Sequence, residues 1–240
     1  MTSIQVPSAA IQVFDRGWVK DKQGNELSVI GSVSPEECQV LHDLVIKNQV
    51  KTVVETGIAR EISSLAICEA LSKTDGKLYG IDPCQGSEHN YAAVETLREF
   101  GFHDRFELTE LGSEVALPQL YAQKFKCDMV FIDGIHRFLE RSVDYLYADR
   151  MLRIGGILAF HDLHLPSMKK VLKMIRTHGT YELVQTPTAR PSIPRRVRLL
   201  AGAIFKRRPS CLWWPNRFSN LLVLKKKAEF DGDFLWHRNF

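Results

Sequence analysis

The sequence TVVETGIAREISS, residues 52–64, decides the fold, because it joins a buried strand to a polar turn and the start of a helix. Thr52 to Val54 is a short, mostly β-branched run of the kind that forms an interior strand. The turn after it contains one glycine, Gly57, and lacks both GxGxxG and GxxxxGK[ST], the patterns that bind a diphosphate. The turn therefore favours a cofactor that carries no diphosphate.

The alternation of strand and helix continues beyond this stretch. Amphipathic segments long enough for crossover helices separate four further apolar runs, at Leu78 to Ile81, Phe106 to Leu108, Met129 to Ile132 and Ile157 to Phe160. Such an alternation is typical of a parallel sheet with helices on both faces. A helix is expected at 168–177, ending near Gly179, and two last strands at 181–184 and 221–224. The predicted fold class is α/β, with a doubly wound, mostly parallel sheet.

The residues before the first strand predict a helix and an N-terminal extension. Ser34 and Glu37 have the spacing of a capping box, with Pro35 at the first helical position, and this helix should run to about Asn48. Residues 1–33 are expected to form an extension with two β-like pieces and a turn, at 11–14, 27–30 and 22–25 respectively.

The positive charge of the chain is concentrated near its C-terminus. The formal net charge is +4, yet the segment from Leu183 to Ala228 holds eleven Lys or Arg and neither Asp nor Glu. This segment includes an insert, residues 185–220, ahead of the last expected strand of a single domain over 34–240. Five widely spaced cysteines without a CxxC pair, and the lack of a signal-peptide or membrane-spanning run, indicate a reducing, cytoplasmic location.

Within the insert, residues 194–214 place an apolar stretch between two basic clusters and end in Trp213 and Trp214. This pattern suits peripheral contact with an anionic membrane surface. The same residues suit a lid over the acceptor, a homodimer contact or a solvated charged loop. Nucleic-acid binding is disfavoured, because no recognition-domain motif accompanies the basic residues.

Polar side chains collect where the expected strands end. In an open parallel sheet, ligands bind beyond the carboxyl ends of the strands, where helix N-termini and free backbone N–H groups converge. Asp82 follows the second strand, where a carboxylate can hold both hydroxyls of a ribose; its alternative role is to cap the turn before Pro83. The other strand ends supply Glu55 and Gly57, Gly112, Ser113 and Glu114, Asp133 and His136, and His161 and Asp162.

At these residues the chain resembles the class I S-adenosylmethionine-dependent methyltransferases, particularly the small-molecule O-methyltransferases of the catechol and macrocin types. The similarity extends over about residues 50–172 and rests on five motifs in the same order. They are VVETG at 53–57, YGID at 79–82, LGSE at 111–114, FIDGIH at 131–136 and GGILAFHD at 155–162. The resemblance implies a Rossmann-like methyltransferase fold with S-adenosylmethionine as the cofactor.

The resemblance also implies roles for individual residues. Glu55 and Gly57 would lie beside the methionine part of the cofactor, with Ser63 in the same cofactor-binding turn. Asp82 would hold the ribose hydroxyls, and Asp133 would face the methyl group. The residues that would border the adenine are Gly112, Ser113 and Glu114.

A divalent cation is implied by the metal-dependent members of this group. Acids that match Asp133 and the pair at His161 and Asp162 bind Mg²⁺ there, and the ion holds the acceptor oxygen in front of the methyl group. Because neutral imidazole is a poor ligand for Mg²⁺, His161 favours another divalent cation, or a metal-free enzyme with a histidine base. The catalytic candidates are Asp133, His136 and His161, with His164 close by. The alternative role of Asp133 is to cap a helix.

The predicted function is methyl transfer to a hydroxyl of a small molecule, such as a sugar, a polyketide or a lipid-linked acceptor. Two alternatives stay open. The family turn commonly has glycine at the positions of Ala59 and Glu61, which would also suit a catalytically degenerate binding protein on the same fold. A nucleic-acid methyltransferase that uses the basic insert is the other alternative.

Overall fold

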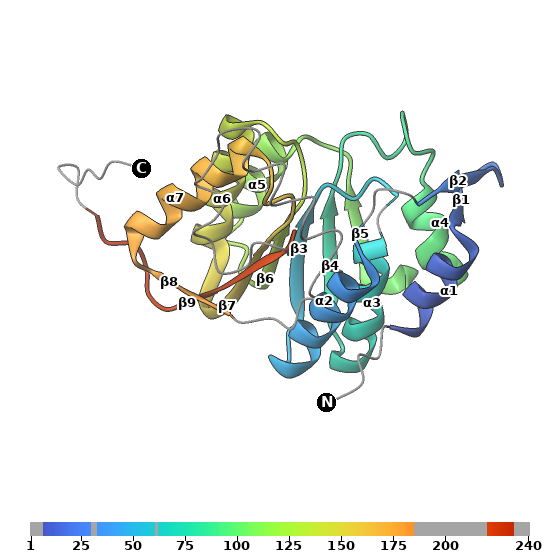
Figure 1. The fold of residues 1–240 in the computed structure, drawn as a ribbon, viewed down its shortest axis with the longest axis horizontal. Helices are drawn as coiled ribbons and strands as arrows, with labels where there is room; N and C mark the ends of the chain where they lie inside the picture. Colours follow the sequence, from blue (N-terminus) through green and yellow to red (C-terminus); the bar gives the residue numbers. More distant parts are fainter. Residues whose placement is uncertain (1–6, 30–32, 61, 185–219, 233–240) are drawn as a thin grey trace, which may run out of the picture.

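The computed structural model describes residues 7–29, 33–60, 62–184 and 220–232, and the predictions for residues 194–214 lie outside these ranges. A seven-stranded sheet forms the centre, in the order β5-β4-β3-β6-β7-β9-β8 (Figure 1). Its strands are β3 (Thr52–Thr56), β4 (Lys77–Ile81), β5 (Phe106–Thr109), β6 (Cys127–Ile132), β7 (Leu152–Phe160), β8 (Tyr181–Leu183) and β9 (Leu222–Lys226). β9 pairs antiparallel with both of its neighbours, and all other pairs are parallel. The predicted doubly wound, mostly parallel sheet is therefore confirmed.

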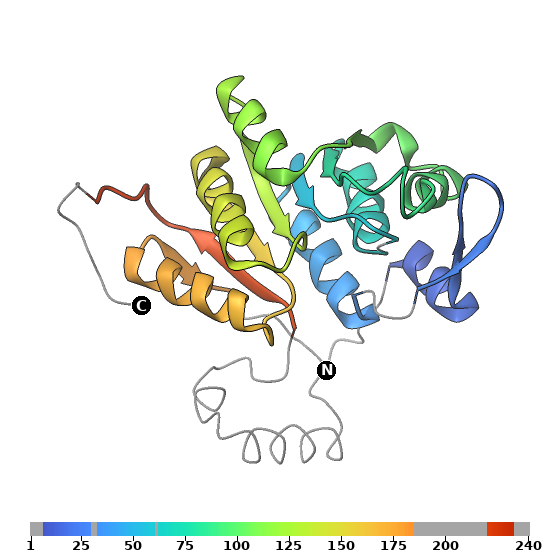
Figure 2. The same cartoon turned by 90° about the horizontal axis from the view of Figure 1, so that it is seen from above.

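Helices cover both faces of this sheet, as Figure 2 shows. One face carries α2 (Pro35–Lys47) and α3 (Ile62–Thr74), with α1 (Ser8–Arg16) and α4 (Ala92–Glu99) packed beside them. The other face carries α5 (Ser113–Ala122), α6 (Phe138–Met151) and α7 (Pro166–His178). A short 3-10 helix, η1 (His103–Arg105), leads into β5. None of the helices in these described ranges has both the length and the apolar character needed to cross a membrane.

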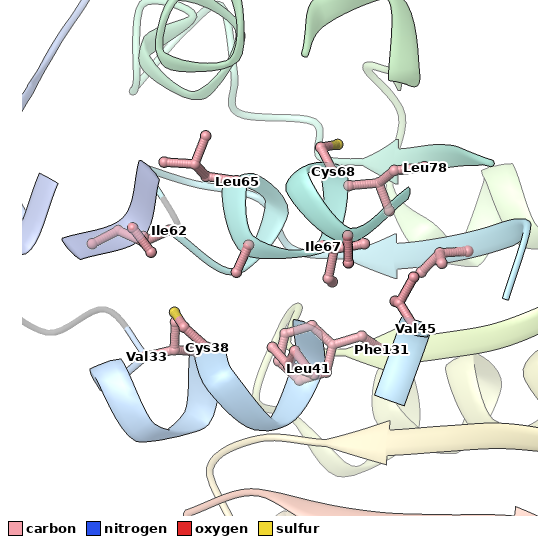
Figure 3. Close-up of a cluster of buried hydrophobic side chains, with 14 of the residues drawn as sticks. Val33, Cys38, Leu41, Val45, Ile62, Leu65, Ile67, Cys68, Leu78 and Phe131 are labelled. Carbon is pink, nitrogen blue, oxygen red and sulfur yellow. The ribbon is translucent and has the colours of Figure 1, made fainter. Parts of the chain in front are cut away.

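The two faces have separate cores, because side chains alternate along each strand. In β6, Met129 and Phe131 belong to the cluster under α2 and α3, whereas Val130 and Ile132 belong to the cluster under α5, α6 and α7. Figure 3 shows Phe131 near Leu41 of α2 in the first of these clusters. Burial on both faces makes the middle of the central strands apolar, as at Val53 and Val54 of β3 and Met129 to Ile132 of β6.

The structure contains the predicted start of the helix at Ser34 and the predicted helix end near Gly179. Ser34 Oγ accepts a hydrogen bond from the Glu37 N–H (3.2 Å), and Glu37 Oε2 accepts one from the Ser34 N–H (2.8 Å), which completes the capping box of α2. At the other end of the chain, α7 stops at Gly179, whose φ of +69° is the left-handed conformation expected at a helix end.

The prediction of a β-like piece at residues 11–14 was wrong, because these residues belong to α1. The buried residues of α1 have helical spacing: Ala9, Ala10 and Val13. The carboxylate of Glu69 in α3 accepts hydrogen bonds from the N–H groups of Ser8 and Ala9, so a distant residue caps this helix. The predicted turn at 22–25 does join two strands, β1 (Trp18–Lys20) and β2 (Glu26–Ser28), and β2 overlaps the start of the predicted piece at 27–30.

Candidate active site

The loops after β3 and β6 meet at the carboxyl edge of the sheet. Gly57 has a φ of +80°, and a Cβ atom on it would lie 2.6 Å from the carbonyl oxygen of Asp133. Backbone hydrogen bonds hold both loops, from the Gly57 N–H to the Ile81 carbonyl and from the Asp133 N–H to the Thr56 carbonyl, each 2.9 Å long. Only glycine suits both the left-handed backbone and this close approach. The residues predicted at the ends of β3 and β6 are therefore adjacent.

Glu55 points toward the start of α3. Its side chain is fully buried and accepts hydrogen bonds from Ser63 Oγ (2.5 Å) and Ser64 Oγ (2.6 Å). Burial raises the pKa of Glu55 to about 7, although both hydroxyl hydrogen bonds favour its ionised form. Glu55 and Ser63 thus lie together, as expected for a cofactor-binding turn, and they bond to each other.

Asp82 holds the turn after β3 from the end of β4. Its Oδ2 atom accepts hydrogen bonds from the N–H groups of Ile58 (3.0 Å) and Ala59 (2.6 Å) and from Gln85 Nε2 (3.1 Å). Oδ1 accepts one from the Cys84 N–H at 2.7 Å, which is the turn-capping role that the sequence left open. The carboxylate is therefore beside the expected cofactor turn, and four protein donors already bind it.

The start of α5 and the end of β3 both hydrogen-bond to one residue, Asp144. Gly112 occupies the N-cap position of α5, Ser113 is buried and Glu114 is exposed. Ser113 and Thr56 Oγ1 both hydrogen-bond to Asp144 of α6, the latter at 3.4 Å. Burial raises the pKa of Asp144 to about 6, although the Ser113 hydrogen bond favours its ionised form. This carboxyl joins the first strand of the site to the helix expected to border the adenine.

Asp133, His161 and Asp162 form one cluster where β6 and β7 end. His161 Nδ1 lies 3.3 Å from Asp133 Oδ2 and 3.7 Å from Asp162 Oδ1, and one ligand atom from each residue lies within 4.8 Å of the others. Asn220, just before β9, donates from Nδ2 to Asp162 Oδ1 at 2.9 Å. Asp133 does not cap a helix, because Arg137 holds the N-cap position of α6. The structure thus brings together the three residues that the resemblance assigned to a cation.

Carboxylates lie on both sides of the His161 ring. Nδ1 faces Asp133 and Asp162, and Nε2 lies 3.4 Å from Oε2 of Glu37, in the first turn of α2. Burial disfavours the charged ring, but the Asp133 and Glu37 carboxylates outweigh burial and raise the pKa of His161 to about 10. An imidazole ring that is protonated on both nitrogens has no lone pair left to accept a further proton. A pKa of about 10 favours a positively charged His161 ring between these carboxylates in the metal-free protein at neutral pH.

His136 has no free ring nitrogen either. Nη2 of the buried Arg141 lies 2.6 Å from His136 Nδ1, and His136 Nε2 lies 3.2 Å from Asp162 Oδ2. Because a guanidinium only donates, Nδ1 must be the acceptor, which places the ring proton on Nε2. Burial and the neighbouring Arg141 charge lower the pKa of His136, so its ring is neutral at neutral pH. Asp133 and Asp162 are then the groups in this cluster that can take a proton from an acceptor.

Sequence reasoning missed five residues of this site, namely Glu37, Gln85, Arg141, Asp144 and Asn220. None of them directly follows one of the strands that the motifs mark. Glu37 was interpreted only as a helix cap, and Arg141 and Asp144 lie within a helix. Their proximity depends on how helices and loops pack against the strand ends, and the linear pattern carries no signal for it.

The donor set of the cluster fits a divalent cation. Adjacent ligands of an octahedral ion with bonds of about 2.1 Å lie about 3 Å apart, close to the 3.3 Å and 3.7 Å separations around His161 Nδ1. One imidazole nitrogen and two carboxylates suit a transition-metal ion better than Mg²⁺. Glu37 lies behind the ring, where ligating histidines commonly have a carboxylate partner.

The central part of the chain matches a known domain. Residues 54–163 match a family model described as a methyltransferase domain. The O-methyltransferase hkm8 of Aspergillus hancockii is 22% identical over 144 residues, which are 60% of this chain and 55% of that protein. The chain thus spans about half the length of this curated relative.

Solved structures with similar folds cover most of the chain. The O-methyltransferase TomG of Streptomyces achromogenes, in complex with S-adenosylmethionine, has a TM-score of 0.62 at 17% identity and covers 95% of this chain and 93% of its own. The methyltransferase PaMTH1 of Podospora anserina, bound to S-adenosylhomocysteine (SAH), has a TM-score of 0.65 at 13% identity, with 93% and 89% covered. An O-methyltransferase from Bacillus cereus in complex with SAH has a TM-score of 0.61 at 16% identity, with 76% and 85% covered. At such identities the likeness establishes the fold.

Proposed function

Because this chain belongs to the class I S-adenosylmethionine-dependent methyltransferases, we propose that it transfers the methyl group of S-adenosylmethionine to a hydroxyl of a small molecule. One observation carries the proposal: Asp133, His161 and Asp162 converge at the ends of β6 and β7, directly beside the turn after β3. A cofactor in that turn would have its methyl group within reach of an acceptor held by these residues.

The cofactor site extends from the turn after β3 to the start of α5. Glu55, Gly57, Ser63 and Asp82 build the turn, and Gly112, Ser113 and Glu114 complete the side of the adenine. Ala59 supports binding rather than degeneracy, because its φ of +42° keeps the left-handed conformation that the glycine of related enzymes adopts easily. Glu61, the other departure from the family turn, lies outside the described residues.

For this reaction the protein must align the acceptor oxygen with the methyl group and remove one proton from the acceptor hydroxyl. Methyl transfer is an in-line displacement at a sulfonium centre, so the acceptor oxygen must be held opposite the leaving sulfur. The carboxylate of Asp133 or of Asp162 accepts the hydroxyl proton, while His136 and His161 hold those carboxylates in place. A divalent cation bound by Asp133, His161 and Asp162 would lower the pKa of the acceptor hydroxyl.

The proposal extends to the class of acceptor, the domain organisation and the cellular location. A sugar, a polyketide or a lipid-linked molecule fits the reaction. We propose that the chain consists of an N-terminal extension (1–33) and a methyltransferase-like domain (34–240) that carries an insert (185–220). We also propose that the enzyme is cytoplasmic and contacts a membrane surface through residues 194–214. A homodimer contact is the alternative use of that insert.

Two measurements on the full chain test the function. Isothermal titration with SAH should give a binding isotherm, and radiolabelled S-adenosylmethionine should label an acceptor from a panel of catechols, sugars and polyketide phenols, with and without Mn²⁺. Asp133→Asn should lower the transfer rate by about 100-fold or more, the usual contribution of a general base, with SAH affinity within about threefold of the parent. Asp104→Asn, an exposed acid, is the matched control. Absence of SAH binding at millimolar concentration would overturn the proposal.

A further inference from the structure

Gln85 carries a buried amide oxygen without a partner beside the proposed ribose site. The residue lies between β4 and α4 and is fully buried. Its Nε2 atom donates to the Ala59 carbonyl (2.6 Å) and to Asp82 Oδ2 (3.1 Å). Since both partners are acceptors, they determine which end of the amide is the NH₂ group. Its Oε1 atom has no hydrogen-bond partner among the described residues.

An unsatisfied buried oxygen of this kind is unfavourable. Folded proteins satisfy nearly all buried polar side-chain atoms, and the exceptions call for a specific explanation. Four other buried side-chain atoms share this property in the described part of the chain, in Gln39, His42, Asp144 and Thr180. Among the five residues, Gln85 is the one that hydrogen-bonds to Asp82. The oxygen without a partner thus belongs to the same amide group whose nitrogen binds the Asp82 carboxylate.

Asp82 has too few free acceptor positions for a whole ribose. A carboxylate offers about four lone-pair positions over its two oxygens. Three donors already bind Oδ2, from Ile58, Ala59 and Gln85, and the Cys84 N–H binds Oδ1. The 2′ and 3′ hydroxyls of a ribose are two donors, so the expected bidentate bond to Asp82 alone would require the protein to give up existing hydrogen bonds. A second acceptor next to the carboxylate removes this conflict.

We propose that Gln85 is a cofactor-binding residue whose amide oxygen accepts one ribose hydroxyl while Asp82 accepts the other. This inference rests on the proposed function and adds a residue to its cofactor site. It also gives the hydrogen bonds of Gln85 Nε2 a role, because they determine which end of the amide is the oxygen and hold the group in place. Gln85 thereby binds both the turn that carries the cofactor and the cofactor itself.

A chemical double-mutant cycle tests the assignment. Isothermal titration compares SAH with its 2′-deoxy and 3′-deoxy analogues on the parent and on Gln85→Met, which preserves the length of the side chain and removes its polar atoms. We expect Gln85→Met to bind SAH about tenfold more weakly than the parent. On the parent, one of the two deoxy analogues should bind about tenfold more weakly than SAH. On Gln85→Met, that analogue and SAH should bind with equal affinity.

The controls separate a direct contact from a structural effect. Gln119→Met, on the exposed side of α5, should leave all three affinities unchanged. If Gln85→Met weakens SAH and both analogues by the same factor, or leaves every affinity unchanged, the assignment of Gln85 is wrong. If the parent itself fails to bind SAH, the proposed function is wrong as well. A crystal structure of the parent with SAH needs no variant: a hydroxyl within about 3.2 Å of Gln85 Oε1 supports the inference, and a longer distance overturns it.

Discussion

At the scale of single residues, the fold suppresses the charge of Glu55 by burying it. It is fully buried at the end of a central strand, and its partners are two neutral hydroxyls, those of Ser63 and Ser64. Burial raises the pKa of this carboxyl, and the neighbouring Asp133 and Asp82 carboxylates raise it further. The cofactor turn is thus joined to α3 by a carboxyl group that is partly protonated near neutral pH.

Glu55→Gln should remove a pH dependence from the stability of the protein. The carboxyl has an ordinary pKa of 4.5 when unfolded and about 7 when folded. The folded state therefore holds the proton more tightly, and the stability that Glu55 contributes falls as the pH rises from about 4.5 to about 7, by about 3 kcal/mol in total. Urea unfolding of parent and variant should show this fall in the difference between their free energies of unfolding. Glu26→Gln, at an exposed site outside the proposed cofactor site, should follow the parent, and a constant difference for Glu55→Gln would contradict the prediction.

At the scale of elements, the first turn of α2 serves the helix and the site together. Glu37 completes the capping box with Ser34 and also faces His161. It lies outside the matched domain of residues 54–163, so the helix before the first strand of the sheet contributes a charge to the centre of the site. The position of α2 is therefore coupled to the protonation of His161.

Glu37→Gln separates these two roles, because glutamine also completes a capping box but carries no charge. We expect the pKa of His161, about 10 in the parent after removal of divalent cations, to fall by about one unit or more. The stability contributed by His161 is fully present below about pH 6.5 and is lost as the pH rises through about 10, so the variant should lose it at a lower pH. NMR titration of the histidine ring resonances measures the shift. Glu36→Gln in the same turn is the control, and an unchanged His161 titration in Glu37→Gln would refute the coupling.

At the scale of the whole molecule, the site exists because two loops far apart in sequence close on each other. Residues 57 and 133 directly follow two neighbouring strands of the parallel sheet, β3 and β6, and their backbones approach too closely for any side chain on Gly57. The order of the strands, with β3 and β6 adjacent at the centre, produces this meeting point. The proposed cofactor turn and the cluster of Asp133, His161 and Asp162 are thereby held side by side.

Gly57→Ala should damage both parts of the site. The added Cβ would meet the Asp133 carbonyl at 2.6 Å in a left-handed backbone, and we expect a loss of stability of at least about 2 kcal/mol and at least about tenfold weaker SAH binding. Gly24→Ala is the matched control, because Gly24 has a similar φ of +85° with nothing within 4 Å of an added Cβ. It should lose about 1 kcal/mol and keep its SAH affinity. Equal effects of the two variants, measured by urea unfolding and titration calorimetry, would show that the loop contact has no special role.

The chain order of strands and helices could be predicted because local patterns determine it. Runs such as Met129 to Ile132 are apolar on both faces, and the capping box at Ser34 and the glycine at residue 179 mark helix ends without reference to any distant residue. The residues after the strands could be named for the same reason. In a parallel sheet all carboxyl ends lie at one edge, so Asp133, His161 and Asp162 had to come near one another. The domain match and the similar structures agree with the predicted fold.

The roles within the site were decided by tertiary packing alone. Whether a histidine acts as a base depends on what faces each ring nitrogen, and Glu37, Arg141 and Asn220 reach the cluster from three separate elements. The helix at residues 8–16 likewise replaced an expected β-like piece, because Glu69 of α3 caps it from a distance. Apolar periodicity can be recognised in the linear sequence. The hydrogen bonds and charge pairs of the site form between residues that only the folded backbone brings together. The sequence by itself therefore determined the fold and the residues at the strand ends, and the three-dimensional arrangement decided which of them can take a proton.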